Sequence, residues 1–564
     1  MYIESIPNRN SRPAILLREA WREGKKIKKR TVANLTDWPE EKVELLRRVL
    51  KGESLVAPKE AFKVEQSLPH GHVEAILGTV KKIGLDTIIA SKPGRKRDLV
   101  IAMIVERLIH PSSKLATTRL WHTTTVAEEL SVSDADEDEL YHALDWLLGR
   151  QERIEKKLAN EHLAEGSLVL YDVTSSYYEG HTCPLAKFGH DRDEKGKRII
   201  VYGALTDHEG RPVAVTVYPG NTGDPSTIPD QTAKLKERFG LDHLVLVGDR
   251  GMLTETQITK IKEMPGIGWI SALRSAAIRE LAGQGSIQMS LFDTVDFAEI
   301  TSPEYPGERL IACFNPLLAE ERKRKRNDLL DVTEKRLASI VRAVQRRTRT
   351  PLGKAEIGKK AGAVINTHKM GKHFTLIMED GLFSFARNKE SITREAALDG
   401  IYVIRTSEPT LPPADVIRNY KNLARVERAF RTLKGIDLLV RPIHHRTEDH
   451  VKAHIFLCTL AYYVEWHMRE ALTPLLFDDE ELPLSRTTRD PVKPGESSSS
   501  AKRKKATKLT LDGLPVQSFP TLLATLGTRC KNRCRMALDS LAPAFTLLTD
   551  PTPIQKRALA LLGL

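Results

Sequence analysis

The sequence predicts an α/β protein built on a mixed β-sheet, and three observations predict that class. Between 167 and 273, short apolar runs alternate with amphipathic stretches, and two of those runs end at an aspartate. Before 165, apolar residues recur mainly at helical spacing. Between 280 and 405, short strands surround a long basic helix. These patterns indicate a sheet-based core with helical and β-rich additions.

Length, composition and charge limit the class further. At about 150 residues per domain, 564 residues predict three or four domains. No run of 18 or more apolar residues occurs and the N-terminus lacks an apolar signal core, so we expect a cytoplasmic protein without membrane association. Five cysteines in so long a chain fit a reducing compartment. The net charge of +13 favours a polyanionic partner.

The N-terminal strands are the first expected elements. Apolar and basic residues at 15–21 and 27–32 flank Glu23-Gly24-Lys25, which is typical of a β-hairpin. Its second strand is basic. That pattern is compatible with an arm that contacts DNA and equally with a solvated edge strand protected by lysines. From about 40 to 165 the pattern is mostly helical, and the helix at 97–109 stops before Pro111.

Five strands follow, and their order predicts the topology of the core. They are expected at 167–172, 199–205, 212–218, 243–249 and 266–273, with helices at 227–239 and 254–263. A hairpin turn at 207–210 joins the second and third strands and helices separate the later ones, so meander strands should precede parallel strands. That order is the order of a ribonuclease H-like sheet. The first and fourth strands end in Asp172 and Asp249.

The remaining chain completes an expected series of seven segments. Strands at 309–314, 374–378, 382–386 and 401–406 are interpreted as an insertion rather than a continuation of the sheet, and the stretch around Cys530 and Cys534 as helix. The segments are an N-terminal β-hairpin arm (1–60), a helical candidate DNA-binding region (61–165), the first part of the core (166–279), an insertion domain with the basic helix (280–405), the second part of the core (406–480), a flexible basic linker (481–510) and a helical C-terminal tail (511–564).

The positive charge is concentrated in one helix. Between Arg322 and Lys360, 14 lysines and arginines face 4 acidic residues. Such a surface binds DNA phosphates without reading sequence, although most charge runs are simply solvated. The candidate DNA contacts are Arg322, Lys323, Arg324, Lys325, Arg326, Arg342, Arg346 and Arg347.

A third carboxylate, Glu427, favours a shared catalytic role for the two strand-end aspartates more than either aspartate does alone. One aspartate after a strand is more often a turn or helix cap, and Glu427 alone is an ordinary partner for Arg431 one turn on. On a single helix, however, Tyr420, Glu427, Arg431 and Lys434 share one stripe beside an apolar stripe. Three carboxylates are what a two-metal phosphoryl-transfer site requires, with Arg431 and Lys434 as phosphate contacts.

Four motifs carry a resemblance to a known family. They are Tyr171-Asp172-Val173-Thr174, the stretch from Gly220 to Thr227, Gly248-Asp249-Arg250-Gly251-Met252, and the helix from Tyr420 to Lys434. Together they resemble the DDE transposases of bacterial insertion sequences, in particular the insertion-sequence-four group and its branch with an extended β-rich insertion. The family helix has Tyr-x2-Arg-x3-Glu-x6-Lys; Tyr420, Glu427 and Lys434 match it, and Leu423 stands in place of the arginine.

The resemblance implies an activity, a cofactor and partners. It implies metal ligation and catalysis by Asp172, Asp249 and Glu427, two Mg²⁺ or Mn²⁺ ions, and DNA contacts by Tyr420, Arg431 and Lys434. It further implies strand cleavage and strand transfer on double-stranded DNA, both at terminal inverted repeats and at a target. A homodimer in a DNA-bound synapse and a nucleoid location are also expected.

Three alternatives remain open at this point. The chain is either a transposase, a ribonuclease H-like nuclease that does not join strands, or a catalytically inactive transposase-derived DNA-binding regulator. Separately, the four-residue spacing of His450, His454 and Cys458 is compatible with zinc. A helix packed after the Glu427 helix is the better interpretation, because no second ligand pair stands at zinc-site spacing.

Overall fold

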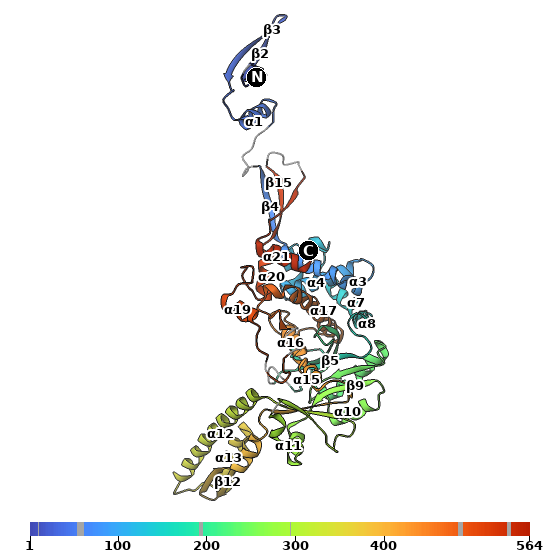
Figure 1. The fold of residues 1–564 in the computed structure, drawn as a ribbon, viewed down its shortest axis with the longest axis vertical. Coiled ribbons are helices and arrows are strands. Elements are labelled where there is room, and N and C mark those ends of the chain that lie inside the picture. The colour runs from blue at the N-terminus through green and yellow to red at the C-terminus, as the bar shows by residue number, and fades with distance from the viewer. Residues whose placement is uncertain are drawn as a thin grey trace. The chain divides into compact units, whose positions relative to one another are not determined.

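The computed structural model describes residues 1–9, 11–53, 61–190, 196–293, 295–482, 489–493, 495–537 and 543–564. The chain separates into two compact units (Figure 1). The smaller unit is Met1–Leu68 with Cys530–Thr549, and the larger is Pro69–Arg529 with Asp550–Leu564. No helix within these ranges combines the length and hydrophobicity needed to cross a bilayer.

The described residues of the smaller unit form two three-stranded sheets and one helix. The predicted hairpin is confirmed: β2 (Ala14–Glu23) and β3 (Lys26–Asn34) pair antiparallel, and β1 (Tyr2–Ile6) adds a strand beside β2. Helix α1 (Glu40–Leu50) follows. The second sheet has the order β16-β15-β4, with β4 at Phe62–Pro69, β15 at Cys530–Met536 and β16 at Phe545–Leu548.

That second sheet corrects one expectation. The segment around Cys530 and Cys534 is a strand, not a helix, and the C-terminal region is therefore not wholly helical. Side chains alternate between the two faces along a strand. In β15, Arg533 and Arg535 lie on the face of their ion-pair partner Glu65. Because Glu65 lies in β4, more than 460 residues earlier, no local pattern announces the pairing.

The larger unit is built on an eight-stranded mixed sheet with the order β10-β11-β14-β9-β8-β5-β6-β7. Strands β5, β6 and β7 form the predicted antiparallel meander, and β8 and β9 run parallel to β5, as the sequence indicated. The bounds are β5 Ser167–Tyr177, β6 Ile199–Thr206, β7 Pro212–Pro219, β8 Leu244–Val247, β9 Ile267–Ala272, β10 Phe297–Ile300, β11 Arg309–Phe314 and β14 Ile401–Thr406.

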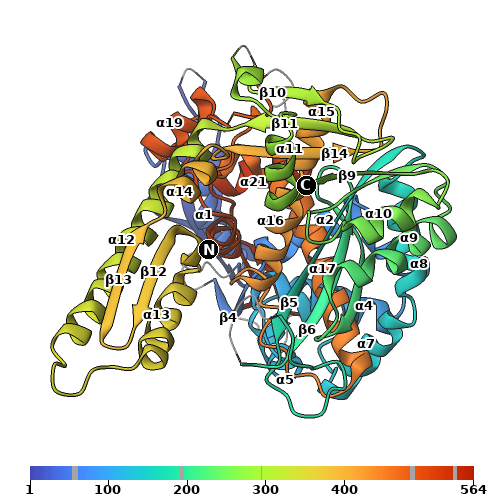
Figure 2. The same cartoon turned by 90° about the horizontal axis from the view of Figure 1, so that it is seen from below.

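The sheet extends further than predicted. Strands β11 and β14 were expected to lie outside it, but β14 pairs antiparallel with β9 and β11 pairs with β14. Both are interior strands, each flanked by a strand on either side, and most of their residues are buried. What projects is the arm between them: α12 (Pro316–Gln345), α13 (Lys354–His368), the hairpin β12 (Phe374–Glu379) and β13 (Leu382–Arg387), and α14 (Lys389–Ala396). Figures 1 and 2 both show the arm standing away from the sheet, and it has its own small core.

Helices surround the sheet. The long helix α17 (Glu448–Leu472) is buried along most of its length and packs on β7, while α16 (Leu423–Lys434) packs on β5. Where the larger unit is described, its other α-helices outside the arm are α2 Gly71–Lys82, α3 Leu85–Ile89, α4 Arg95–Ile109, α5 Lys114–Leu120, α6 Val126–Glu129, α7 Glu137–Leu148, α8 Gln151–His162, α9 Ile228–Ala233, α10 Glu255–Lys262, α11 Ser275–Gly283, α15 Pro413–Lys421, α19 Ser499–Thr507, α20 Phe519–Gly527 and α21 Pro553–Leu562.

The expected basic linker at 481–510 is structured over part of its length. Within it α19 forms, and Lys504 is only 2% exposed. The Lys504 ammonium donates to the carbonyl oxygens of Thr473 (3.0 Å) and Leu476 (3.3 Å), which lie just beyond the C-terminal end of α17. A basic run that resembles solvated chain therefore includes one lysine that serves as a cap. Residues 483–488 and 494 of that segment lie outside the described ranges.

Candidate active site

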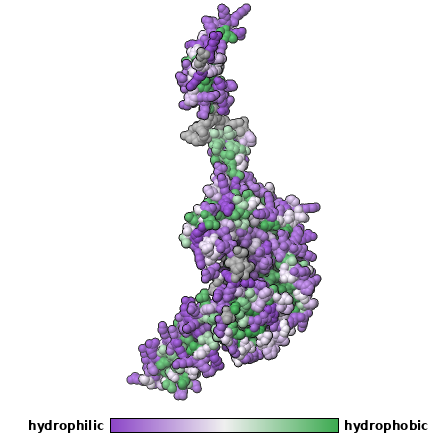
Figure 3. All heavy atoms as spheres, viewed as in Figure 1, coloured by the Kyte–Doolittle hydropathy of each residue, from purple (hydrophilic) through white to green (hydrophobic). Residues whose placement is uncertain are grey.

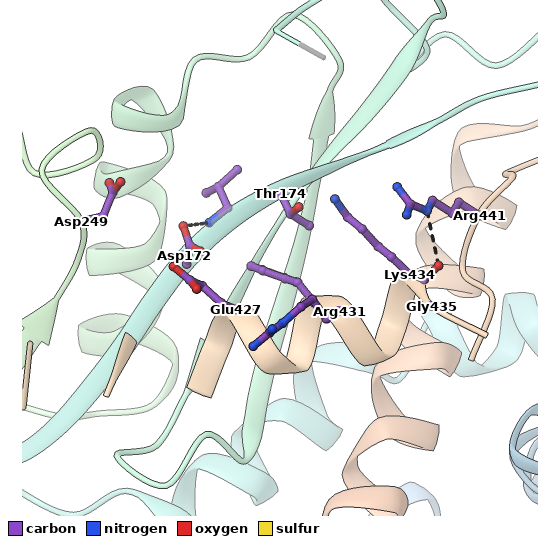
Figure 4. Close-up of a pocket in the computed structure, with 10 residues that line it drawn as sticks. Asp172, Thr174, Asp249, Glu427, Arg431, Lys434, Gly435 and Arg441 are labelled. Carbon is purple, nitrogen blue, oxygen red and sulfur yellow. Dashed lines mark hydrogen bonds between the residues drawn. The ribbon is translucent and has the colours of Figure 1, made fainter. Parts of the chain in front are cut away.

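Strand β5 and helix α16 meet at a pocket of about 420 Å³. The three carboxylates singled out from the sequence all line it, although they lie 77 and 178 residues apart along the chain. Figure 4 shows the carboxylates toward one end of the pocket and cationic side chains toward the other. The residues lining it are Asp172, Val173, Thr174, Asp249, Glu427, Phe430, Arg431, Lys434, Gly435 and Arg441.

Asp172 lies in β5 at the point where pairing with β8 ends and pairing with β6 continues. The sequence predicted that the strand ends at Asp172, but β5 runs on to Tyr177 because β6 continues to pair with it. What ends there is the parallel pairing: Leu170 and Val247 form the last pair of β5 with β8. Asp172 therefore lies just beyond the carboxyl end of the parallel strands, with its Oδ1 accepting from the Val173 amide at 2.8 Å.

Asp249 reaches the same edge from β8. It follows Val247 by two residues, the same offset that separates Asp172 from Leu170. Because β5 and β8 are adjacent paired strands, this register brings both aspartates to the same edge of the sheet. The Asp249 Oδ1 accepts from the amides of Gly251 (2.9 Å) and Met252 (2.8 Å), which fixes its orientation in the turn.

Glu427 comes from α16, whose apolar stripe packs as predicted. Leu423, Val426, Phe430 and Leu433 are buried, while Glu427 itself is exposed on the pocket side. In Figure 4 the Asp172 and Glu427 side chains point toward one another, and Asp249 stands further off on its own loop. The helix thus presents a rigid carboxylate to an edge that already carries two.

Tyr420 differs from its prediction in one respect. The expected single helix is divided at Asn422, so that Tyr420 belongs to α15 and Glu427 to α16; Asn422 keeps helical angles (φ −64°, ψ −16°). Burial raises the pKa of the Tyr420 phenol to about 12, and the negative charges of Asp249 and Glu427 add to that rise. Tyr420 therefore lies within electrostatic reach of both carboxylates, although it does not line the pocket.

The cationic end contains one residue that the sequence analysis missed. Arg431 and Lys434 line the pocket, and Arg441 joins them from the segment after α16. The Arg441 Nε donates to the carbonyl oxygen of Lys434 at 3.3 Å, and its guanidinium lies 5.9 Å from the centre of the Tyr177 ring. Arg441 precedes a proline in a segment without a motif, so only the crossing of α16 over β5 reveals it.

Leu423, which replaces the arginine of the family helix, is 8% exposed and belongs to the main apolar core. A side chain in that position faces the interior of the larger unit. No phosphate contact is available from it.

The donor atoms of the pocket suit a divalent, oxygen-preferring cation. Among the described residues, the pocket offers carboxylate and hydroxyl oxygens rather than thiol or imidazole groups, which is the ligand type that Mg²⁺ and Mn²⁺ take. Yet no three His, Cys, Asp or Glu side chains in the described ranges are gathered closely enough to hold an ion as they stand. The carboxylates share a pocket without forming a closed cage.

The histidines considered for zinc have other partners. His450 lies 3.2 Å from Asp145, and the buried His454 places Nε2 3.2 Å from the Val440 carbonyl oxygen. Burial holds the pKa of His454 well below its usual value. His454 is thus a neutral core residue that ties α17 to the segment before Arg441.

The basic residues predicted to bind DNA lie mostly on the arm, not at the pocket. Lys323, Arg324, Lys325, Arg342, Arg346 and Arg347 are exposed on or just after α12. Arg322 is half-buried and donates to the carbonyl oxygen of Ile401 at 3.3 Å. Arg326 is the exception: it is 7% exposed and holds both oxygens of Asp399, at 2.8 and 2.6 Å. Its guanidinium is engaged inside the protein, and we remove it from the DNA-contact set.

Carboxylates just beyond the ends of parallel strands, with cations lining the same pocket, are suited to phosphoryl transfer. Residues 164–464 match the transposase DDE domain, and residues 3–61 match the N-terminal domain of IS1634 family transposases, a group related to the insertion-sequence-four transposases. The chain belongs to the DDE transposases of bacterial insertion sequences. It is an enzyme of the polynucleotidyl-transferase type that acts on DNA, and the nuclease and regulator alternatives are not favoured. Its family generally uses divalent metal ions.

Comparison with solved structures gives a weaker likeness. The cryo-EM structure of the piggyBac transposase synaptic complex with hairpin DNA is 10% identical to this chain, with 80% of this chain and 89% of that chain covered and a TM-score of 0.32. We base no argument on a likeness of that size. No curated protein matches the sequence.

Proposed function

We propose that the chain cleaves DNA at the terminal inverted repeats of an insertion sequence and joins the freed end to target DNA, with Asp172, Asp249 and Glu427 as the catalytic carboxylates. One observation carries the proposal. Carboxylates from two adjacent strand ends and one helix line the same pocket as three cationic side chains.

The topology supports a ribonuclease H-like core. Within the sheet, the order β7-β6-β5-β8-β9 places an antiparallel meander beside two parallel strands, with β5 central. We assign the core to 166–279 and 406–480, extended by β10, β11 and β14, and the inserted arm to 316–398. Helix α16 then brings Glu427 back to β5 after the insertion.

The three carboxylates are proposed to hold two Mg²⁺ or Mn²⁺ ions. Ions held by these carboxylates would supply Lewis-acid chemistry, polarisation of the scissile phosphate and activation of a water or 3′-hydroxyl. The chain's own contribution is orientation: the Gly251 and Met252 amides fix Asp249, and the buried stripe of α16 fixes Glu427. At the other end, Arg431, Lys434 and Arg441 would neutralise the DNA phosphates next to the reacting one.

The remaining parts of the proposal concern DNA and assembly. The cations of the arm are assigned to phosphate contacts that do not depend on sequence: the half-buried Arg322 and the exposed Lys323, Arg324, Lys325, Arg342, Arg346 and Arg347. We infer a homodimer in the DNA-bound synapse and a cytoplasmic, nucleoid-associated location. Tyr420, which interacts electrostatically with Asp249 and Glu427, is assigned to a contact with the bound DNA.

Substitution of each carboxylate tests the proposal. Asp172→Asn, Asp249→Asn and Glu427→Gln should each abolish Mg²⁺-dependent cleavage of duplexes carrying the element ends, and DNA affinity should stay within about twofold, because each change keeps side-chain shape and removes only a metal-binding charge. Asp242→Asn and Glu263→Gln, exposed acids outside the pocket, serve as matched controls. Normal cleavage by any of the three pocket variants would remove that residue from the site.

A joining assay tests strand transfer separately. With a 3′-labelled element end and a supercoiled plasmid, wild-type protein should produce a covalently joined product of higher mass. Cleavage without any joined product would support the nuclease activity alone.

A further inference from the structure

The β2–β3 hairpin extends beyond the sheet that supports it. Strand β1 pairs with β2 only from Ala14 to Arg18, whereas β2 and β3 remain paired as far as Glu23 and Lys26. Residues 19–30, here called the distal ribbon, are therefore two-stranded, and all side chains from 20 to 30 are exposed. Gly24, with φ +62°, takes the first position of the two-residue turn, where the left-handed region is required.

The distal ribbon carries a large excess of positive charge. Its twelve residues include six lysines and arginines and two glutamates. Glu19 pairs with Arg30 at 2.9 Å, and Glu23 contacts Lys28. Three further cations, Arg22, Lys25 and Lys26, stand at or beside the turn and are exposed. The charge excess is therefore greatest at the tip of the hairpin.

Two exposed apolar side chains argue against a merely solvated edge. Trp21 is 44% exposed and Ile27 is 68% exposed. Lysines protect an edge strand without help from a tryptophan or an isoleucine, and a two-stranded ribbon is marginally stable in water unless something packs on it. Figure 3 shows this part of the molecule as mostly hydrophilic with a few apolar side chains among the charges. A partner that binds both cations and apolar groups fits this surface.

Strand alternation separates the two faces of the ribbon. Cross-strand pairing puts Arg22 opposite Ile27 and Ala20 opposite Lys29, on one face. Both glutamates lie on the other face, with Trp21. Within the distal ribbon, the first face therefore carries Arg22, Lys29, Ala20 and Ile27 and neither of the ribbon's two glutamates. Lys29 on that face also contacts Glu4 of β1 at 3.4 Å, which steadies the base of the ribbon.

We propose that the distal ribbon is a DNA-binding element whose Arg22 and Ile27 face enters the major groove. The groove is about 12 Å wide and admits a two-stranded ribbon. Arg22 would reach a base edge or phosphate, Ile27 a thymine methyl group, and Lys25 and Lys26 the flanking phosphates. A protein partner fits less well, because protein interfaces are depleted in lysine and this ribbon has four in twelve residues.

This inference rests on the proposed function only in that DNA is the ligand, and it is tested by binding alone. The experiment uses the full-length protein and a fluorescent 30-base-pair duplex of mixed sequence. The ribbon variant combines Arg22→Gln, Lys25→Gln and Lys26→Gln. The control variant combines Arg12→Gln, Lys42→Gln and Lys51→Gln, three exposed cations of the same unit outside the ribbon.

The ribbon variant should bind at least about tenfold more weakly than the control variant, and its salt slope should fall by up to about 0.9 for each phosphate that it no longer neutralises. A duplex with glucosylated 5-hydroxymethylcytosine, which fills the major groove, should bind wild-type protein more weakly than the unmodified duplex. Netropsin, which occupies the minor groove, should leave binding unchanged. Hydrogen exchange of residues 14–34 should slow on addition of DNA, a readout that also shows whether the variant hairpin is folded.

Equal affinity of the ribbon and control variants would overturn the inference, as would normal binding to the glucosylated duplex. A change in oligomeric state with unchanged DNA affinity would also overturn it and assign the ribbon to a protein interface. None of these outcomes affects carboxylate-dependent cleavage. Conversely, loss of strand transfer in wild-type protein would refute the proposed function and leave the ribbon's DNA binding standing.

Discussion

Positive charge is concentrated in two regions of this molecule, the pocket and helix α12. The two regions differ in whether the cationic side chains have partners within the protein or project into solvent. At the pocket, three cationic side chains stand near three carboxylates, and Arg441 is held by the Lys434 carbonyl oxygen and the Tyr177 ring. On α12, most cations project into solvent from an arm with its own small core.

The difference teaches how the two groups can act. A cation held in place gives up little freedom when a phosphate arrives, so it can favour one geometry and contribute to the reaction itself. A solvated cation on a long side chain attracts phosphates by counterion release and distinguishes little between positions. The pocket should therefore govern rate and the arm should govern affinity.

Arg326 should give the largest effect. It lies on the arm, but unlike its exposed neighbours it is buried and ion-paired with Asp399. Arg326→Gln would leave the nearly buried Asp399 without its partner, and breaking such a pair costs about 3–5 kcal/mol. Hydrogen exchange within 316–398 should therefore speed up, with Lys325→Gln as the neighbouring control. Unchanged exchange in the Arg326 variant would show that the pair does not stabilise the arm.

Arg441→Gln should have the next largest effect. Removal of one oriented donor to a developing charge costs about 100-fold in rate, so single-turnover cleavage should slow by that order while DNA affinity changes by less than about threefold. Arg446→Gln, an exposed residue of the same segment, should cleave normally. Equal reductions of affinity and rate would instead make Arg441 an ordinary binding residue.

The features that the sequence predicted correctly are those that depend on local patterns. The apolar stripe of α16, the strand order of β5 to β9 and the β2–β3 hairpin follow from periodicity and turn residues within short windows, and all three are found. The convergence of Asp172, Asp249 and Glu427 on one pocket was inferred from strand ends and a helix stripe, both local features.

What the sequence could not predict depends on long-range pairing. The β11 and β14 strands look like insertion strands until β9 is seen to bind β14, more than 120 residues away. Arg441 has no motif, and Arg326 is indistinguishable from its four basic neighbours until Asp399 approaches it. Tertiary contacts decided these cases, because the same residue types are equally compatible with solvent.

The exposed cations of α12 should give a smaller, uniform effect. Lys323→Gln, Arg324→Gln and Lys325→Gln together should weaken binding to any duplex by about tenfold and lower the salt slope by up to about 2.7, at about 0.9 per phosphate contact. Single-turnover cleavage at saturating protein should be unchanged. A loss confined to element-end DNA would show that the arm reads sequence.

Substitution of Tyr420 should have the smallest effect. It tests whether this phenol near the pocket takes part in proton transfer. With a pKa of about 12 in the folded protein against about 10 when unfolded, the phenol stays protonated and neutral throughout the usual assay range. Tyr420→Phe should therefore leave the shape of the rate–pH profile from pH 6 to pH 9 unchanged and lower the rate by less than about threefold, the cost of one neutral hydrogen-bonding group. Because the folded state holds its proton more tightly than the unfolded state, Tyr420 lowers stability only as pH rises above about 10, and the variant should lose less stability there than wild type. A profile displaced within pH 6–9 would mean that Tyr420 exchanges a proton during the reaction and belongs with the carboxylates.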